Sequence, residues 1–294
     1  MKIFVAGNRG QLGSDCMEIL SAEHAVRGMD LPELDIADPQ GRAQALGDGP
    51  EAIVNCAAFT RVDACETERE AALRVNAAGP RCLADHAARH GALLVHVSTD
   101  YVFDGRREPP LPYTEQDPTG PLSWYGETKR QGERAVMQSG CRYAILRTAW
   151  LYGFRGKNFL KTMLRLALRP EGDDIKVVND QYGSPTWSRR LARQIGAVLD
   201  TGATGLFHAT AEGYCTWFEL ARTFLEAMRI DHRLVPCTTE EYDTAAVRPR
   251  NGILENSALK AAGLHVMRDW KEDVREFAAM YRETLIEEAR ASWA

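Results

Sequence analysis

The sequence has no long hydrophobic run. After Met1 and Lys2, the apolar stretch at residues 3–6 ends at Gly7, which is too short for the apolar region of a secretory signal. No other run approaches the length of a membrane span. We therefore expect a soluble, cytoplasmic protein with no membrane partner.

Cysteine and histidine clusters at metal-binding spacing are also missing. The seven cysteines are scattered, with no C-x-x-C motif and no zinc-like group, so we expect reduced thiols in the core of a cytosolic protein. His86 and His90 have the i, i+4 spacing that could hold a metal, but no third ligand accompanies them. We interpret them as one face of a surface helix.

Blocks of one charge are absent as well. Lys and Arg number 36 against 41 Asp and Glu, the formal net charge is −5, and the two signs are mixed along the chain. A nucleic-acid surface needs clustered basic residues, so we expect no nucleic-acid partner. A local basic pocket for a phosphate is compatible with this balance.

What the chain does contain is an alternation of short apolar runs with helical segments. Its 294 residues can bury a full-sized core. This alternation predicts an α/β fold with a Rossmann-type, doubly wound parallel sheet and a smaller, helix-rich substrate-binding domain. We expect the dinucleotide-binding domain at 1–150, with later returns of the chain, and mainly the substrate domain at 151–294. The predicted strands are residues 2–6, 25–29, 52–56, 93–97 and 143–148.

Helix signals are strongest after residue 150. Residues 158–168 and 188–199 have helical periodicity, and a final helical pair follows Arg248 and Pro249. Thr216 and Glu219 have the spacing of a capping box, in which each side chain bonds the other residue's main chain.

Two helix starts are expected in the first half. Asp63 and Glu66 also have capping-box spacing, for a helical region that continues to His90. Asp38 and Pro39 are predicted to begin another helix.

A glycine-rich turn follows the first predicted strand. Its three glycines are spaced as G-x-x-G-x-x-G and precede a helical pattern. Glycines allow a tight turn and let the backbone approach a pyrophosphate, which then lies at a helix N-terminus. A plain strand-to-helix turn is the structural alternative. The dinucleotide-binding residues that this motif predicts are Gly7, Gly10, Gln11, Leu12 and Gly13.

The choice between NADH and NADPH rests on residues of opposite charge. Asp30 follows the second predicted strand, twenty positions after Gly10, where an acid would meet the adenine ribose hydroxyls of NADH. Arg9 and Arg27 could instead neutralise the 2′-phosphate of NADPH. Both cofactors fit this pattern, and we expect dual use.

Tyr125 and Lys129 carry the predicted chemistry. They are four residues apart, so the phenol and the ammonium share one face of a helix. A fixed cation lowers the pKa of a tyrosine from about 10 and makes it a general acid or base. Thr99 follows a predicted strand and would stand at the sheet edge where ligands bind. We predict Thr99, Tyr125 and Lys129 as catalytic residues. The Pro- and Gly-rich stretch between Gly105 and Leu122 is expected to be an exposed loop over the site.

Together with the glycine turn, this constellation resembles the extended short-chain dehydrogenase/reductase family. The segments 98–105 and 179–186 narrow the resemblance to the dTDP-4-dehydrorhamnose reductases, and it runs from Lys2 to the last helix. The resemblance implies that NADPH or NADH reduces the 4-keto group of dTDP-4-dehydro-6-deoxy-L-mannose to give dTDP-L-rhamnose. It implies that Tyr125 gives the proton, that Thr99 bonds the same oxygen, and that Lys129 holds the nicotinamide ribose.

The resemblance also implies further binding residues. Near the cofactor it places Asp35 and Ile36 beside the adenine, and Ala57, Ala58 and Phe59 at the nicotinamide-side ribose. On the substrate side it places Thr99, Asp100, Tyr101, Trp150 against the hexose and Arg248 at a nucleotide phosphate. From the residues alone, Trp150 could equally be a core residue and Arg248 part of a surface ion pair. A returning strand is implied at 205–210.

Three other functions are compatible with parts of this pattern. The enzyme could reduce another nucleotide-4-keto-hexose. A sugar-nucleotide 4,6-dehydratase would have Asp then Glu after the threonine, whereas here Asp100 is followed by Tyr101. A non-catalytic, cofactor-binding regulatory subunit, such as the beta subunit of methionine adenosyltransferase, also resembles these reductases. Retention of Thr99, Tyr125 and Lys129 favours the enzyme.

The sequence departs from part of the family at a metal site. Some of these reductases dimerise around a magnesium ion held by three glutamates, and Asp15, Arg189 and Met280 align with those positions. Magnesium needs hard oxygen ligands, and an arginine would repel it. We therefore expect no metal and a monomer rather than a metal-bridged dimer.

Overall fold

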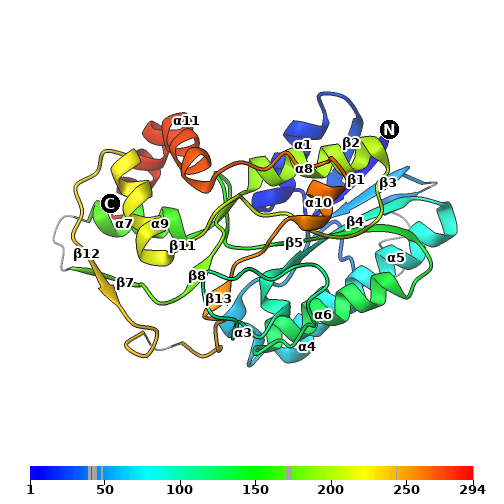
Figure 1. Ribbon diagram of the computed structural model, residues 1–294. Helices are drawn as coiled ribbons and strands as arrows, with labels where there is room; N and C mark the ends of the chain where they lie inside the picture. Colours follow the sequence, from blue (N-terminus) through cyan, green and yellow to red (C-terminus); the bar gives the residue numbers. More distant parts are fainter. Residues whose placement is uncertain (39–40, 42–44, 48, 170–173, 243, 294) are drawn as a thin grey trace.

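A parallel six-stranded sheet forms the centre of the molecule (Figure 1). The computed structural model describes residues 1–293 except 39–40, 42–44, 48, 170–173 and 243. The strand order is β10-β5-β4-β3-β1-β2, and every neighbouring pair is parallel. The doubly wound sheet and all five predicted strands are confirmed. The strands are β1 (Lys2–Ala6), β2 (Ala25–Met29), β3 (Ala52–Asn55), β4 (Leu93–Thr99), β5 (Arg142–Thr148) and β10 (Gly205–His208).

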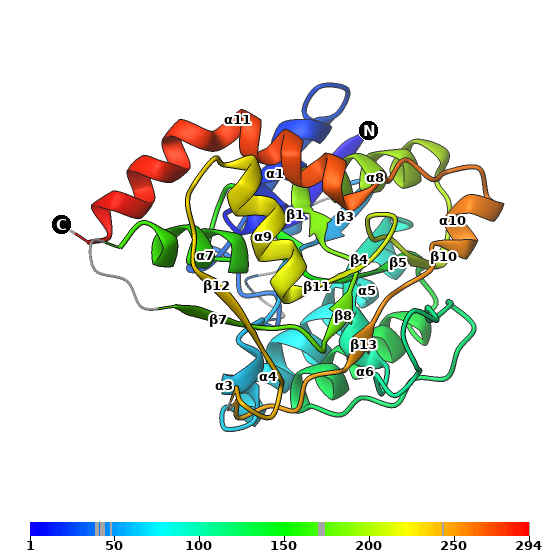
Figure 2. The same ribbon diagram turned by 60° about the vertical axis from the view of Figure 1, so that its left-hand side comes forward.

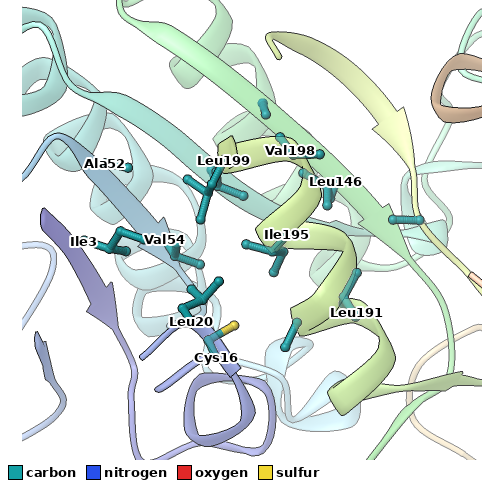
Figure 3. Packing of buried hydrophobic residues seen from close by; sticks show 14 of the residues in the cluster. Ile3, Cys16, Leu20, Ala52, Val54, Leu146, Leu191, Ile195, Val198 and Leu199 are labelled. Atoms are coloured by element: carbon teal, nitrogen blue, oxygen red, sulfur yellow. The ribbon is translucent and has the colours of Figure 1, made fainter. Parts of the chain in front are cut away.

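Both faces of the sheet are covered by helices, which is why its strands are almost continuously apolar. In β1, Ile3 packs on one face and Phe4 on the other, and both are buried. Figure 3 shows the first face, where α1 (Gln11–Leu20) and α8 (Ser188–Thr201) lie against strand residues such as Val54. The helices of the other face are α5 (Gly79–His90) and α6 (Trp124–Met137).

The order of the strands reverses beside β1. From β1 the chain proceeds to β2 on one side and later to β3 and β4 on the other. The loops after β1 and β3 therefore diverge at the carboxyl edge of the sheet. Open α/β sheets bind ligands in the crevice at such a point.

A second, smaller core lies beside the sheet (Figure 2). Its helices are α7 (Phe159–Ala167), α9 (Trp217–Ala227) and α11 (Trp270–Ala291). The predicted capping box of α9 is confirmed, since the Glu219 N–H donates to Thr216 Oγ1 at 3.2 Å and the Thr216 N–H to Glu219 Oε2 at 2.9 Å. Short strands complete this part: β6 (Leu151–Tyr152), β7 (Ile175–Val178), β8 (Tyr182–Gly183), β9 (Thr186–Trp187), β11 (Cys215–Thr216), β12 (Leu234–Cys237) and β13 (Asn251–Gly252).

The chain crosses between the two parts more than once. The segment expected to return, 205–210, supplies β10, which pairs with β5 in the large sheet. Helix α8 packs on α1, and the short helix α10 (Ser257–Ala261) packs beside β10. A single boundary at residue 150 remains a proposal.

The capping box predicted at Asp63 is wrong. Asp63 lies inside α3 (Val62–Cys65), whose cap position makes no side-chain bond. The Asp63 carboxylate instead accepts hydrogen bonds from the main chain of Ala246 and the side chain of Arg248. The region to His90 is also not one helix, and the start expected at Asp38–Pro39 lies partly outside the described residues. The helical region runs through α3, α4 (Arg69–Leu73), the π-helical turn η1 (Arg74–Ala78) and α5.

Only one residue of the histidine pair lies on the surface, His90, which is exposed. His86 is only 2% exposed because α5 turns this side toward its neighbours, and its ring stacks on that of His90 with centroids 4.3 Å apart. All seven cysteines are free thiols. Within the part of the chain that the structure describes, no helix is long and apolar enough to span a membrane.

Candidate active site

A cavity of about 580 Å³ opens at the carboxyl edge of the sheet. Its volume is in the range of small-molecule sites. The loops after β1, β3, β4 and β5, the start of α6 and the smaller part of the molecule all contribute to it. Ten predicted site residues line it: Gly10, Gln11, Leu12, Ala58, Thr99, Asp100, Tyr101, Tyr125, Lys129 and Trp150.

The glycine turn is built for close backbone approach. Gly7 has a positive φ of 79° and donates its N–H to Met29 O at 2.8 Å. A Cβ on Gly13 would lie 2.0 Å from the carbonyl oxygen of Gly7, so no side chain fits there. Gly10, at the N-cap of α1, faces the cavity. This bare turn at a helix N-terminus fits the pyrophosphate of a dinucleotide.

The wall after β3 is held by two buried asparagines. Asn55 accepts the N–H of Ala57 at 3.1 Å. Asn76, on the π-helical turn η1, accepts the N–H of Phe59 at 2.8 Å and donates to its carbonyl at 3.0 Å. Sequence reasoning missed both asparagines, because only the tertiary fold brings their amides to this wall.

The acids near the predicted adenine end of the cofactor site already have hydrogen-bond partners within the protein. Asp30 accepts the N–H of Arg9 at 3.1 Å, and the Arg9 guanidinium pairs with Glu33 and donates to Leu31 O. Arg27 takes no part in these contacts with Asp30 and Glu33. Its guanidinium lies over the Phe4 ring and donates to Leu46 O at 2.6 Å. These contacts give no support to the expectation that Arg27 neutralises a 2′-phosphate, which stays a prediction.

Asp35 and Ile36 are not among the described residues that line the cavity. The Asp35 carboxylate pairs with Arg74. Ile36 is buried and packs over Gly79, where a Cβ would come within 2.5 Å of its Cδ1. Both residues therefore have partners within the protein, and their contact with an adenine stays a proposal.

Helix α6 presents the predicted catalytic pair. Ser123 caps it, accepting the N–H of Gly126 at 3.2 Å. Gly126 lets the helix approach the turn after β4, because a Cβ there would be 2.2 Å from Tyr101 O. Tyr125 and Lys129 both line the cavity, as their i, i+4 spacing predicts. The Lys129 ammonium donates to Val97 O at 2.6 Å.

The pKa of Tyr125 is raised, not lowered. Burial is the largest cause, a hydrogen bond shared with the Thr99 side chain opposes it, and the charge of Asp100 adds to it. From the sequence, Lys129 was expected to lower the pKa of Tyr125. In the structure, the cost of burying a phenolate is larger than the opposing effects. Tyr125 is therefore protonated at neutral pH, which is the state that a proton donor requires.

Two other buried groups titrate near neutral pH. Burial lowers the pKa of Lys129 to about 8, although the nearby Glu133 raises it. Burial also raises the pKa of Asp100 to about 7, against a hydrogen bond from Thr99. The Thr99 hydroxyl donates to Asp100 Oδ1 at 3.0 Å, so the state of this carboxyl affects how the hydroxyl points into the cavity.

Aromatic rings form the side of the cavity that faces the smaller part of the molecule. Trp150 lines the cavity and is only partly buried, so its ring can contact a ligand as well as the core. Tyr101 meets the ring of Tyr125 edge-on with centroids 5.4 Å apart. Sequence reasoning missed several lining residues, some beside predicted site residues and others on distant segments: Cys56, Thr60, Val62, Ser98, Thr148, Leu151, Lys157, Asn158 and Trp217.

Arg248 forms an ion pair. Its guanidinium donates to both Asp63 oxygens, at 3.1 and 2.8 Å, which joins the segment after β12 to α3. This matches the ion-pair alternative that the sequence left open, except that the arginine is half buried rather than on the open surface. Its charge also acts on Tyr101, which lines the cavity, so Arg248 stands near the rim. A phosphate contact remains a proposal.

The loop between Gly105 and Leu122 does not cover the cavity. Tyr113 is buried and forms a bridge with Leu254, while Glu115 accepts the N–H groups of His208 and Ala258. None of the loop's residues is among the described residues that line the cavity. The expectation of a loop over the site is wrong, because buried Tyr113 directs the loop toward β13 and β10.

The three aligned metal positions have partners of other kinds. Asp15 accepts a hydrogen bond from Ser188, Arg189 pairs with Glu18 at 2.6 Å, and Met280 is exposed. Among residues 1–293, where described, no group of three or more acidic, His or Cys side chains could hold a metal ion. Function without a metal stays a prediction.

Comparison with known proteins places this geometry in a family. The family described as the RmlD substrate binding domain matches residues 1–283. The dTDP-4-dehydrorhamnose reductase of Burkholderia thailandensis is 38% identical, over 92% of this chain and 96% of its own length. A dTDP-4-keto-6-deoxy-D-glucose reductase of Streptomyces niveus is 41% identical, over 90% and 92%.

A solved structure supports the same family. The dTDP-4-dehydrorhamnose reductase of Bacillus anthracis, in complex with NADP, is 37% identical and superposes with a TM-score of 0.91. The match covers 95% of this chain and 99% of that one. The chain therefore belongs to the RmlD substrate binding domain family, whose similar members named above are reductases of dTDP-4-keto sugars.

Proposed function

We propose that this protein reduces the 4-keto group of dTDP-4-dehydrorhamnose with NADPH or NADH and produces dTDP-L-rhamnose. The observation that carries the proposal is the meeting of Thr99, Tyr125 and Lys129 in one cavity with the bare glycine turn. The relatives from B. thailandensis and B. anthracis support the choice of substrate by their names. The NADP in the latter supports the cofactor.

The residues of the cavity have separate tasks in this proposal. A bound nicotinamide supplies the hydride that reduces the carbonyl carbon. Tyr125, kept protonated by burial, donates its proton to the carbonyl oxygen as negative charge develops there. In this proposal the Thr99 hydroxyl turns from Asp100 Oδ1, to which it donates in the structure, and donates to the same oxygen. A donor in that place stabilises the transition state more than the ground state. The product alcohol thus receives one hydride and one proton.

Lys129 supplies a positive charge to the lining of the cavity. Its ammonium is fixed by Val97 O and lies one helical turn from Tyr125. We assign it two roles, holding the nicotinamide-side ribose and stabilising the phenolate that proton transfer leaves behind. With a pKa of about 8, it is mostly charged at neutral pH.

The remaining assignments follow the same scheme. For cofactor binding we retain Gly7, Gly10, Gln11, Leu12, Gly13, Asp30, Asp35, Ile36, Ala57, Ala58 and Phe59. For substrate binding we retain Asp100, Tyr101, Trp150 and Arg248. We also propose a cytoplasmic, monomeric enzyme.

A different dTDP-4-keto-hexose is the second candidate substrate. The relative from S. niveus is named for dTDP-4-keto-6-deoxy-D-glucose and is as similar to this chain as the rhamnose enzymes are. The same Thr99, Tyr125 and Lys129 would serve either sugar. Stereochemistry at the other ring carbons therefore decides between them, through the aromatic side of the cavity.

Turnover assays test the proposal. The purified protein is given dTDP-4-dehydrorhamnose, dTDP-4-keto-6-deoxyglucose or UDP-4-keto-rhamnose, each with NADH and with NADPH, and cofactor oxidation is followed. We expect the highest kcat/KM with dTDP-4-dehydrorhamnose. Preference for the glucose-configured sugar would select the second candidate. Tight cofactor binding without oxidation of any pair would instead indicate a regulatory subunit.

A further inference from the structure

Trp217 is a cavity residue with no assigned task. It is the first residue of α9, and its indole stacks on that of Trp150 with centroids 3.6 Å apart and planes 9° from parallel. Both rings line the active-site cavity. In this face-to-face stack each indole covers one face of the other, so one outer ring face and the ring edges are left for whatever occupies this end.

Trp150 is held in this stack at a conformational cost. Its φ of 47° is in the left-handed region, which bulky residues rarely adopt and which costs about 1–3 kcal/mol. Gly183 leaves room for the ring, since a Cβ there would lie 2.4 Å from Trp150 Cε2. The main chain is fixed by the Thr186 N–H, which donates to Trp150 O at 3.3 Å. Surrounding contacts therefore hold this strained residue in place.

Trp217 is held from behind by a buried amide. Its indole N–H donates to Gln181 Oε1 at 3.2 Å, and Gln181 Nε2 donates to Thr239 Oγ1 at 3.1 Å. Gln181 is only 5% exposed, so its amide cannot easily exchange these partners for water. Thr239 in turn donates to Asp180 Oδ1 at 2.6 Å. The chain of bonds fixes the rotation of the Trp217 ring, and through the stack that of Trp150.

We propose that Trp217, by stacking on the Trp150 ring already assigned to the hexose, makes the two rings act as one two-layer aromatic wall, and that Gln181 is its positioning residue. This inference rests on the proposed function, because it assigns this end of the cavity to the sugar. The wall provides shape and apolar contact but takes no part in proton transfer. Its loss should therefore weaken sugar-nucleotide binding while leaving the cofactor site intact.

Conservative variants test the wall. Trp217→Phe and Trp150→Phe are each expected to raise the KM for the nucleotide sugar about 10-fold, with the Kd of NADPH changed less than about 2-fold. Because the rings act together, the double variant should raise KM about 10-fold rather than about 100-fold. Trp293→Phe is the matched control, since it also removes an indole N–H bonded to a carbonyl, that of Arg165, but lies at the end of the chain.

Gln181→Met tests the positioning role separately. Methionine has a similar volume but cannot accept the indole N–H, so the Trp217 ring loses its anchor. We expect KM to rise about 3-fold to 10-fold with kcat reduced less, and the melting temperature close to wild type. This variant contains both tryptophans, so the readout remains if a tryptophan variant folds poorly.

The outcomes separate this inference from the proposed function. If the wild-type protein reduces no 4-keto sugar nucleotide, the proposed function fails. If the wild type is active but both tryptophan variants have wild-type KM, the wall is wrong while the function stands. Multiplicative effects in the double variant, or an unchanged KM in Gln181→Met, would overturn the coupling of the rings or the role of the amide.

Discussion

The proposed cofactor side and the proposed substrate side of the cavity are built in different ways. The cofactor side consists mainly of backbone: a glycine turn after β1 and small residues after β3. The substrate side consists of large side chains, chiefly Trp150 and Trp217, that are held by bonds between distant segments. Backbone contacts suit the pyrophosphate that all dinucleotides share, whereas side-chain contacts can distinguish one sugar from another.

This difference predicts where change is tolerated. A side chain added to the glycine turn collides with main chain, which cannot move aside cheaply. A changed ring on the substrate side leaves the sheet untouched and alters only the shape of a wall. Relatives with similar identity but differently named sugar substrates are consistent with this division.

Tyr125→Phe should have the largest effect, because Tyr125 lies where the two sides meet. The variant keeps the ring and its packing but lacks the proton donor. We expect kcat to fall about 10²-fold or more, with little change in the Kd of the cofactor. Near-normal turnover would remove Tyr125 from the chemistry.

Gly13→Ala should disable the cofactor side. The new Cβ would lie 2.0 Å from Gly7 O, so the turn or the helix must shift. We expect the Kd of NADPH to rise at least about 30-fold, measured by titration, with a lower melting temperature. Gly196→Ala is the matched control, since its Cβ would meet only Leu20 at 3.5 Å in the middle of α8. Equal effects of the two would contradict the backbone-built site.

Lys129→Met should separate activity from stability. We expect about 10-fold losses in both cofactor affinity and kcat, because one ammonium serves both. Burial lowers the folded pKa from 10.5 to about 8, so stability present above pH 10.5 is lost as the pH falls through about 8. Burying the ammonium thus costs stability at pH 7, and the variant should melt no lower than wild type there.

The same pKa predicts a pH profile. Wild-type kcat/KM should decline above pH about 8 as the ammonium of Lys129 loses its proton. The Met variant should lack this decline. A wild-type profile flat through pH 9, or an unchanged decline in the variant, would show that another group is responsible.

Cofactor selectivity should change only modestly. Arg9 is exposed and screened by solvent, so Arg9→Gln should lower kcat/KM for NADPH about 5-fold and leave NADH unchanged. Arg27→Gln is the control, because Arg27 is engaged with Phe4 and Leu46. The wild-type kcat/KM values with NADH and with NADPH should differ by less than about 10³-fold. A larger ratio needs a difference of over about 4 kcal/mol between the two activation free energies.

Chelation should have no effect. The proton comes from Tyr125, Thr99 bonds the same oxygen, and Arg189 is paired with Glu18 where the family's metal ligand would be. We expect full activity in EDTA and a monomer by light scattering. Activity lost to EDTA and restored by magnesium would show that the alignment of Asp15, Arg189 and Met280 is wrong.

Local patterns predicted the cofactor side well. The strands, the glycine turn and the i, i+4 placement of Tyr125 and Lys129 depend on neighbours in sequence, and the structure has them. The direction of the Tyr125 pKa was predicted wrongly, because burial depends on everything packed around the ring. Spacing likewise suggested a capping box at Asp63, where a distant arginine is the actual partner.

The substrate side was largely inaccessible to such reasoning. Trp217 stands at an ordinary helix start, and only the fold places its ring on Trp150. The loop after Gly105 has the composition of an exposed segment, yet one buried tyrosine, Tyr113, directs it away from the cavity. In both cases a single long-range contact decided the outcome.

The π-helical turn η1 limits how this chain can vary in length. A π turn contains one more residue than an α turn, and here the extra residue places Asn76 so that its amide bonds both main-chain groups of Phe59. Deleting one residue from 74–78 would restore a regular helix and rotate Asn76 by about 100° away from that wall. Insertions and deletions should therefore be rare here among relatives that keep the cofactor site.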